Sequence, residues 1–118
     1  LGTVGGQGRS TWDALHAWHA DDLSGPWRPH AKNPLLIDAA CARPAGRCFF
    51  NKGRLVRPVQ NCVGGYGASL AFAEVMRLDQ QDFDQRVIAS LAPDPRWRAH
   101  GVHTLNTSER FEAIDFFA

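Results

Sequence analysis

The stretch AGRCFFNKGRLVRPVQNC, residues 45–62, decides the fold of this chain. An apolar run breaks at residues 51–53, Asn-Lys-Gly, and then resumes. A break of this kind between two apolar runs predicts a tight β-hairpin, with Gly53 at a positive φ. The second arm contains Pro58, which cannot donate a ladder hydrogen bond, and it is therefore predicted to be an edge or bulged strand.

The second arm of this hairpin also carries planar side chains with several hydrogen-bond donors, at Arg54, Arg57 and Gln60. Such groups are unusual along a half-buried strand, because a buried charge or amide needs partners. The pattern leaves two interpretations open. Either these side chains bind a ligand, or they hold neighbouring parts of the fold together.

The remaining segments extend the β pattern without settling it. Residues 66–78, YGASLAFAEVMRL, and residues 83–91, FDQRVIASL, fit a strand or a helix equally well. Residues 102–106 and 110–117 predict a final hairpin around residues 107–109. An all-β chain of about eight antiparallel strands, at the spacing of sandwiches and barrels, is favoured, and an α+β fold is the alternative.

Composition limits the class of protein. The 118 residues are enough for one domain, and with 44% hydrophobic and 21% charged residues the chain can bury a core. A formal net charge of +1 argues against nucleic acid as a partner. No apolar run approaches the roughly 20 residues of a membrane span, so no membrane partner is expected.

The cysteines and the first residues indicate compartment and boundaries. Cys41, Cys48 and Cys62 form no CxxC pattern, and we expect reduced, mostly buried thiols rather than disulfides or a zinc ribbon. No signal peptide is visible, and together with the thiols this favours a cytoplasmic location. Residues 1–11, which include GGQGRS, predict a flexible Gly-rich terminus before a single β domain over residues 12–118.

Several motifs carry a family resemblance. HADDLSGPWRPHAKNP (19–34), ARPAGRCFFNKGRLVRPVQNC (42–62), YGASLAFAEVMRL (66–78), GVHTLN (101–106) and EAID (112–115) occur in this order. The set resembles the later part of a five-bladed β-propeller domain associated with plant glucosamine inositolphosphorylceramide transferases and their bacterial relatives. That domain is similar in turn to arabinanase, xylosidase and invertase glycoside hydrolases.

The resemblance implies strands for the ambiguous segments, and two propeller-like blades of four strands each. Two blades cannot close a ring, and the apolar faces left uncovered would drive association. The expected partners are therefore further copies in a homo-oligomer, or the remainder of a longer chain. The hydrolases carry their catalytic acids on earlier blades, and no position in this chain matches them.

The resemblance also implies a ligand site, since Arg43, Arg57 and Gln60 match the family's RPAG and RP-x-Q motifs, and His103 can face the same inner space. Guanidinium and amide groups suit saccharide hydroxyls, phosphates or carboxylates. The alternative is that they join adjacent blades. The chain offers no sign of a cofactor, and the spacing of its histidines does not favour a metal site.

Other candidates are weaker. Glu74 is the one acid set among apolar residues, and it would be the catalytic group if the chain were an enzyme. Trp12, Trp97 and Tyr66 offer flat faces for sugar rings, whereas Trp18 is expected in the core.

Three hypotheses follow. The first is a non-catalytic, carbohydrate-associated binding or assembly module. The second is a glycoside hydrolase or glycosyltransferase-type enzyme completed by oligomerisation or by missing blades. The third is an orphan gene fragment that has kept no ligand.

Overall fold

The computed structural model of the chain describes residues 1–3 and 12–118. These residues form antiparallel β-strands, one short 3-10 helix at Pro95–Trp97, and no α-helix. The two ambiguous segments are both strands, β8 (Ser69–Leu78) and β9 (Phe83–Leu91). The predicted all-β antiparallel class is therefore confirmed. Most of the Gly-rich terminus, residues 4–11, lies outside the described residues, and Gly2–Thr3 form strand β1.

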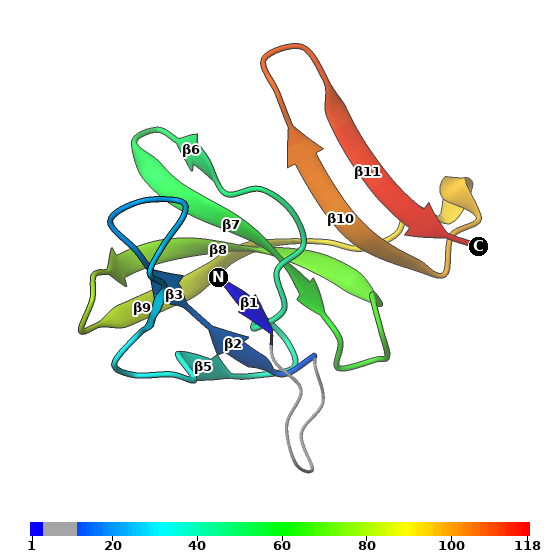
Figure 1. The fold of residues 1–118 in the computed structure, drawn as a ribbon. Helices are drawn as coiled ribbons and strands as arrows, with labels where there is room; N and C mark the ends of the chain where they lie inside the picture. Colours follow the sequence, from blue (N-terminus) through cyan, green and yellow to red (C-terminus); the bar gives the residue numbers. More distant parts are fainter. Residues whose placement is uncertain (4–11) are drawn as a thin grey trace.

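The centre of the structure is a twisted four-stranded sheet in the order β6-β7-β8-β9 (Figure 1). It is built from β6 (Phe49–Asn51), β7 (Arg54–Asn61) and the two long strands that follow. The turn between β6 and β7 places Lys52 at φ 50° and Gly53 at φ 77°. Two successive positive φ values are typical of a type I′ turn, so the predicted hairpin is confirmed.

The prediction that Pro58 marks an edge strand is wrong, because β7 lies between two neighbours. Pro58 is opposite Phe72 of β8, and its carbonyl accepts a hydrogen bond of 2.9 Å from the N–H of Ala45 on the other side. In an antiparallel strand the N and the C=O of one residue point the same way. The missing N–H of Pro58 therefore faces the loop before β6 and removes nothing from the β7–β8 ladder.

The two faces of the central sheet carry separate cores. On one face, Val59, Ala71 and Ala73 pack with Cys41 and Leu36 from the N-terminal part of the chain. On the other face, the core comprises Ala45, Leu70, Val102 and Leu105, packed against Phe72, Leu91, Trp97 and Ile114. Side chains of neighbouring residues in a strand point to opposite faces, and this alternation divides the two cores.

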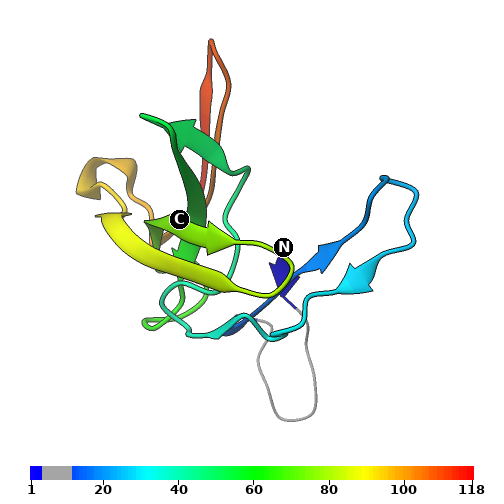
Figure 2. The same cartoon turned by 90° about the vertical axis from the view of Figure 1, so that its left-hand side faces the viewer.

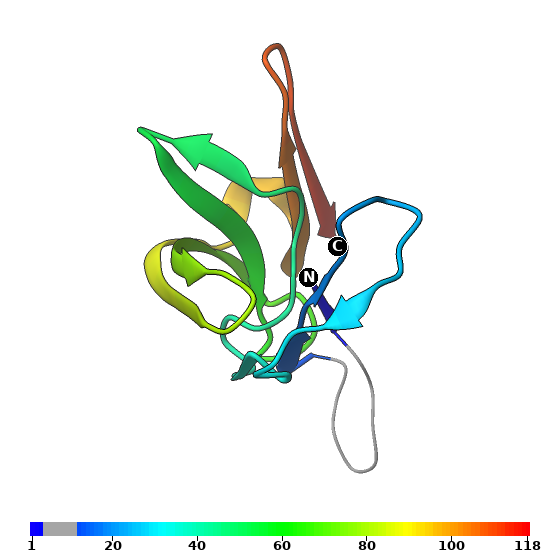
Figure 3. The same ribbon diagram turned by 60° about the vertical axis from the view of Figure 1, so that its left-hand side comes forward.

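The flanking strands form smaller sheets. Strands β1, β2 (Ala14–His16) and β5 (Leu36–Ile37) form one sheet, and β3 (Trp18–His19) pairs with β4 (Arg28–Pro29) in an arm that extends away from the central sheet (Figure 2). Strands β10 (Gly101–Thr107) and β11 (Glu112–Phe117) form the predicted final hairpin, and β10 packs against β7 and β8 (Figure 3).

The arrangement differs in detail from two blades of four strands. Within the described residues one four-stranded sheet is present, flanked by a three-stranded sheet and two two-stranded ones. The strands number eleven instead of about eight, because four of them are only two residues long. The three cysteines are free as expected, with Cys41 and Cys62 buried and Cys48 half-buried. In the part of the chain that the structure describes, no helix is long and apolar enough to span a membrane.

Candidate functional site

Four rings lie side by side where the loop after β7 meets the hairpin β10–β11. The centroid distances are 5.4 Å from Trp12 to Tyr66, 4.8 Å from Tyr66 to His103, and 4.8 Å from His103 to Phe117. We call these four residues the aromatic row. Trp12, Tyr66 and Phe117 are each 38–39% exposed, and neighbouring ring planes are tilted by 45° and 53° or stacked at 24°, so the row presents several partly exposed apolar ring surfaces to solvent.

Charged groups border the aromatic row on both sides. The Arg43 guanidinium lies over the Tyr66 ring, 4.9 Å from its centroid, and its Nη2 approaches the Tyr66 hydroxyl at 3.4 Å. Asp115 Oδ2 lies 3.4 Å from Nδ1 of His103. A flat apolar surface with hydrogen-bonding groups at its rim is the combination that binds a polar ring-shaped molecule.

The sequence explains why this loop can lie so close to the hairpin. Gly67 has a φ of +65°, and a Cβ there would lie 2.3 Å from Cδ2 of His103. A Cβ at Gly101 would lie 2.3 Å from the Gly67 carbonyl oxygen and equally close to the Phe117 ring. The Gly67 carbonyl accepts a 2.8 Å hydrogen bond from the N–H of Val102. The two glycines thus permit the close packing that assembles the row.

Three of the four predicted ligand residues meet at this site. Arg43 and His103 belong to its surface, whereas Gln60 is buried beneath it, 3% exposed, and donates from Nε2 to the carbonyl of His103 at 2.9 Å. Gln60 therefore positions the backbone of His103 and does not reach the surface itself. Gln60 of β7 and His103 of β10 come together because these two strands pack against each other.

Arg57 lies apart from the other three, on the opposite face of β7. It is 1% exposed, and its guanidinium donates to the carbonyl of Ala42 at 2.8 Å and to Oε1 of Gln85. Burial lowers the pKa of the Arg57 guanidinium. These contacts join the N-terminal segment to β9, as the second of the two original interpretations requires.

Glu74 is 6% exposed and lies on a different part of the central sheet. Its Oε2 accepts hydrogen bonds from Nε and Nη2 of Arg86, at 3.1 and 2.9 Å, and lies 3.5 Å from Nη1 of Arg54. The sequence predicted apolar surroundings for the Glu74 carboxylate, but in the structure two guanidinium groups from neighbouring strands contact it.

The other aromatic candidates divide differently from the prediction. Trp12 and Tyr66 belong to the row, but Trp97 packs on the core beside Phe116, with ring centroids 5.8 Å apart. Trp18 is 40% exposed and stacks on His16, so its expected place in the core is wrong. The segment folds as an arm whose two short strands leave that ring uncovered.

Two residues of the site, Asp115 and Phe117, were not predicted from the sequence. They occupy alternate positions of β11, and in the register of the hairpin Phe117 is opposite Gly101 and Asp115 opposite Thr104. The alternation was visible in the sequence. It gave no sign that this face of the hairpin meets the loop containing Tyr66.

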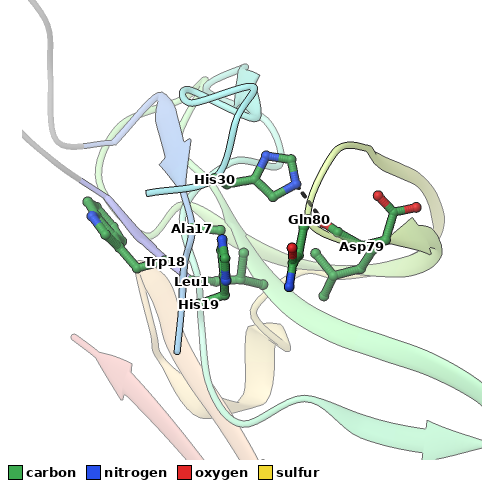
Figure 4. Close-up of a pocket in the computed structure, with 8 residues that line it drawn as sticks. Leu1, Ala17, Trp18, His19, His30, Asp79 and Gln80 are labelled. Carbon is green, nitrogen blue, oxygen red and sulfur yellow. Dashed lines mark hydrogen bonds between the residues drawn. The ribbon is translucent and has the colours of Figure 1, made fainter. Parts of the chain in front are cut away.

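Away from the aromatic row, a cavity of about 340 Å³ lies between β3 and the β8–β9 turn (Figure 4). Trp18, His19 and Gln80 line it, with Leu1, Ala17, His30, Leu78 and Asp79. His30 is buried, accepts from the N–H of Lys32 at Nδ1, and contacts the Asp79 carbonyl at 2.7 Å through Nε2. Because Nδ1 accepts, Nε2 carries the proton, and His30 acts as a link between the arm and the turn.

Ion pairs strengthen the same link. Lys32 pairs with Asp82, and Arg77 pairs with both Asp79 and Asp82. Backbone N–H groups and Arg77 hold the pKa of Asp79 down at about 2. Within residues 1–3 and 12–118, no group of three or more His, Cys, Asp or Glu side chains is arranged to hold a metal ion.

Comparison with known proteins places the chain in a family. The family model described as "Glucosamine inositolphosphorylceramide transferase 1, N-terminal" matches residues 4–110. Glucosamine inositolphosphorylceramide transferase 1 of Oryza sativa subsp. japonica is 32% identical over 73 residues, which are 60% of this chain and 10% of that protein. The Arabidopsis thaliana protein of the same name is 31% identical over 71 residues, 58% of this chain and 9% of that protein.

The chain thus spans about a tenth of the length of these curated relatives. No solved structure matches it. The family match covers most of the chain, including the loop with Tyr66 and strand β10 with His103, and it ends before β11, which carries Asp115 and Phe117. The chain therefore belongs to the family of glucosamine inositolphosphorylceramide transferase 1 N-terminal domains.

Proposed function

We propose that this chain is a non-catalytic module that binds a saccharide on the aromatic row, as part of a larger sugar-transferring protein. The observation that carries the proposal is the row itself, three partly exposed rings of which Trp12 contacts Tyr66 and His103 lies between Tyr66 and Phe117. Sugar rings have flat faces of C–H groups that pack on aromatic rings, and hydroxyls that need polar partners at the edge. The relatives are named glucosamine inositolphosphorylceramide transferases, and the amino sugar in this name supports a saccharide as the ligand.

A binding role agrees better with these contacts than catalysis does. Glycoside hydrolysis needs two carboxyl groups of which one serves as an acid, and Glu74 has its carboxylate engaged by two arginines. The second acid of such a pair has no candidate beside it in the described part of the chain. The glycoside hydrolase form of the enzyme hypothesis is therefore disfavoured, whereas the transferase names of the relatives keep a glycosyltransferase-type enzyme as the alternative.

We extend the proposal to the architecture. The four-stranded sheet resembles one blade of a β-propeller, and the sheets on its two faces resemble parts of the blades before and after it. Strands β9 and β11 each leave one edge unpaired within the described residues, and Val87, Ile88 and Met76 are 46–50% exposed. Unpaired edges and exposed apolar side chains favour association, with the rest of a longer chain or with further copies.

Saccharide binding is tested on a glycan array with the unmodified chain and with the variants Arg43→Ala and Tyr66→Leu. We expect each variant to weaken binding about tenfold, the effect of losing a stacked ring or a cation beside it. Phe50→Leu is the matched control, since Phe50 is 75% exposed and far from the row along the chain. No binding to any glycan, or equal weakening by the control, would overturn the saccharide proposal.

Association is tested separately by sedimentation of the chain at several concentrations. We expect a mass above 13.0 kDa that falls on dilution. A stable species with the mass of one chain at every concentration would refute association between copies and leave the longer chain as the means of covering these faces.

A further inference from the structure

Two cations, Lys52 and Arg54, lie at the start of β7, at the opposite end of the strand from Gln60. A cavity of about 310 Å³ is lined by Asn51, Lys52, Arg54, Val56 and Ile88, and we call it the basic cleft. Arg54 and Gln60 are six residues apart on one strand, which corresponds to about 20 Å. The basic cleft is therefore separate from the aromatic row.

Arg54, which lines this cleft, and Arg86 on the neighbouring strand β9 share a buried carboxylate, that of Glu74. Glu74 is directly opposite Val56 in the β7–β8 ladder and opposite Arg86 in the β8–β9 ladder. Its side chain is only 7% exposed, whereas the side chains of Arg54 and Arg86 are 62% and 56% exposed. Glu74 thus holds the Arg86 guanidinium with two short hydrogen bonds, whereas Arg54 approaches it through Nη1 alone, at 3.5 Å, and the rest of the Arg54 guanidinium faces outward.

The cleft has more positive charge than it needs for its own ion pairs. Lys52, Arg54 and Arg86 are cations, and in the described part of the chain Glu74 is the only carboxylate that pairs with any of them. Two positive charges are therefore uncompensated. Arg54 uses a single Nη1 in its ion pair, so its Nε and Nη2 donors remain for another acceptor.

We propose that the basic cleft binds the oxyanion of a small ligand, a phosphate or a carboxylate group. The outward donors of the Arg54 guanidinium lie in one plane, a geometry that suits a planar or tetrahedral oxyanion. Lys52, in the adjoining turn, adds a point charge that suits phosphate. Val56 and Ile88 give the cleft an apolar wall, which suits the carbon skeleton that bears the anion.

The test is a titration of the complete chain with inorganic phosphate, followed by NMR of the backbone amides and of the arginine Nε–H groups. We expect saturable shifts at Lys52, Arg54 and Arg86, and none at the aromatic row. Arg54→Gln and Lys52→Gln should each weaken binding about tenfold, the usual effect of losing one charge-assisted contact. Lys52 lies in an exposed turn, so this variant keeps the test valid if Arg54→Gln fails to fold.

Arg110→Gln is the matched control, because Arg110 is an exposed cation in the β10–β11 turn and loses the same charge. Glucose 6-phosphate, glucuronate and glucose then distinguish the source of the oxyanion: binding of the first alone assigns a phosphate, of the second alone a carboxylate. Absence of saturable shifts, equal displacement by chloride, or equal weakening in Arg110→Gln would overturn the proposal. The outcome is independent of whether the aromatic row binds a saccharide.

Discussion

Replacing Arg57 by alanine gives the sharpest test of how the polar side chains of β7 are used. The guanidinium is almost fully buried and makes hydrogen bonds to the Ala42 carbonyl and to Gln85. Each hydrogen bond of a charged group contributes about 1.5–3 kcal/mol. Relief of the cost of burying the charge offsets part of the loss, and the unpaired Ala42 carbonyl adds about 1–3 kcal/mol.

We therefore expect Arg57→Ala to lower the free energy of unfolding by about 3 kcal/mol. For a chain of this size, with a urea m-value of roughly 1.5 kcal/mol/M, the midpoint should fall by about 2 M. The unfolding can be followed by the fluorescence of the four tryptophans. Arg57→Met, which keeps the aliphatic volume, should cost about half as much, since the charge no longer needs to be buried.

Arg110→Ala serves as the control, and as an exposed turn residue it should change stability by less than about 0.5 kcal/mol. A midpoint for Arg57→Ala within about 0.5 M of the unmodified chain, combined with loss of saccharide binding, would refute the structural role and return Arg57 to the ligand site.

Three further substitutions or treatments test other parts of the structure. Gly67→Ala should lower the free energy of unfolding by about 2 kcal/mol and shift the His103 ring resonances, because the added Cβ would meet that ring. Gly53→Ala is the control and should cost about 1 kcal/mol, since Gly53 has a similar φ but nothing within 4 Å of an added Cβ. Equal effects of the two substitutions would contradict the close contact between Gly67 and His103. Leu70→Ala, at the fully buried centre of the core shared with the hairpin, should cost about 3–5 kcal/mol in urea unfolding, and a loss below about 1 kcal/mol would contradict that packing. Burial, with the nearby Asp38 carboxylate, raises the pKa of the Cys41 thiol to about 11, so about one thiol in a thousand is ionised at pH 8. Iodoacetamide should therefore modify Cys41 more slowly than the half-buried Cys48, and equal rates at the two cysteines would disprove this. Because the folded pKa lies above the unfolded value of 9.0, the stabilisation from Cys41 is present below pH 9 and is lost as the pH rises towards 11, which urea midpoints of the chain and of Cys41→Ala can measure.

The local chemistry of the strands could be predicted because it depends on neighbouring residues. Asn51, Lys52 and Gly53 required a turn with positive φ, and the alternation in residues 110–117 required a strand. Pro58 was misinterpreted because the sequence gives no sign of which neighbour its missing N–H would face. That neighbour is the segment of residues 43–45, which precedes β6 in the chain and lies beside the part of β7 that β6 does not reach.

The sequence by itself determined the all-β class and the β6–β7 and β10–β11 hairpins, and through the family resemblance it grouped Arg43, Arg57, Gln60 and His103 as one predicted ligand site. Only the tertiary structure separated Arg57 from the other three, because residues one or three apart in a strand point to opposite faces and the packing of each face is set by distant segments. The same long-range packing brought Tyr66 to His103, beside which the hairpin places Asp115 and Phe117. The pairing of β8 with its two neighbouring strands placed two arginines on Glu74. Contacts between segments 30 or more residues apart depend on how sheets stack, and a local pattern of residue types does not specify that stacking.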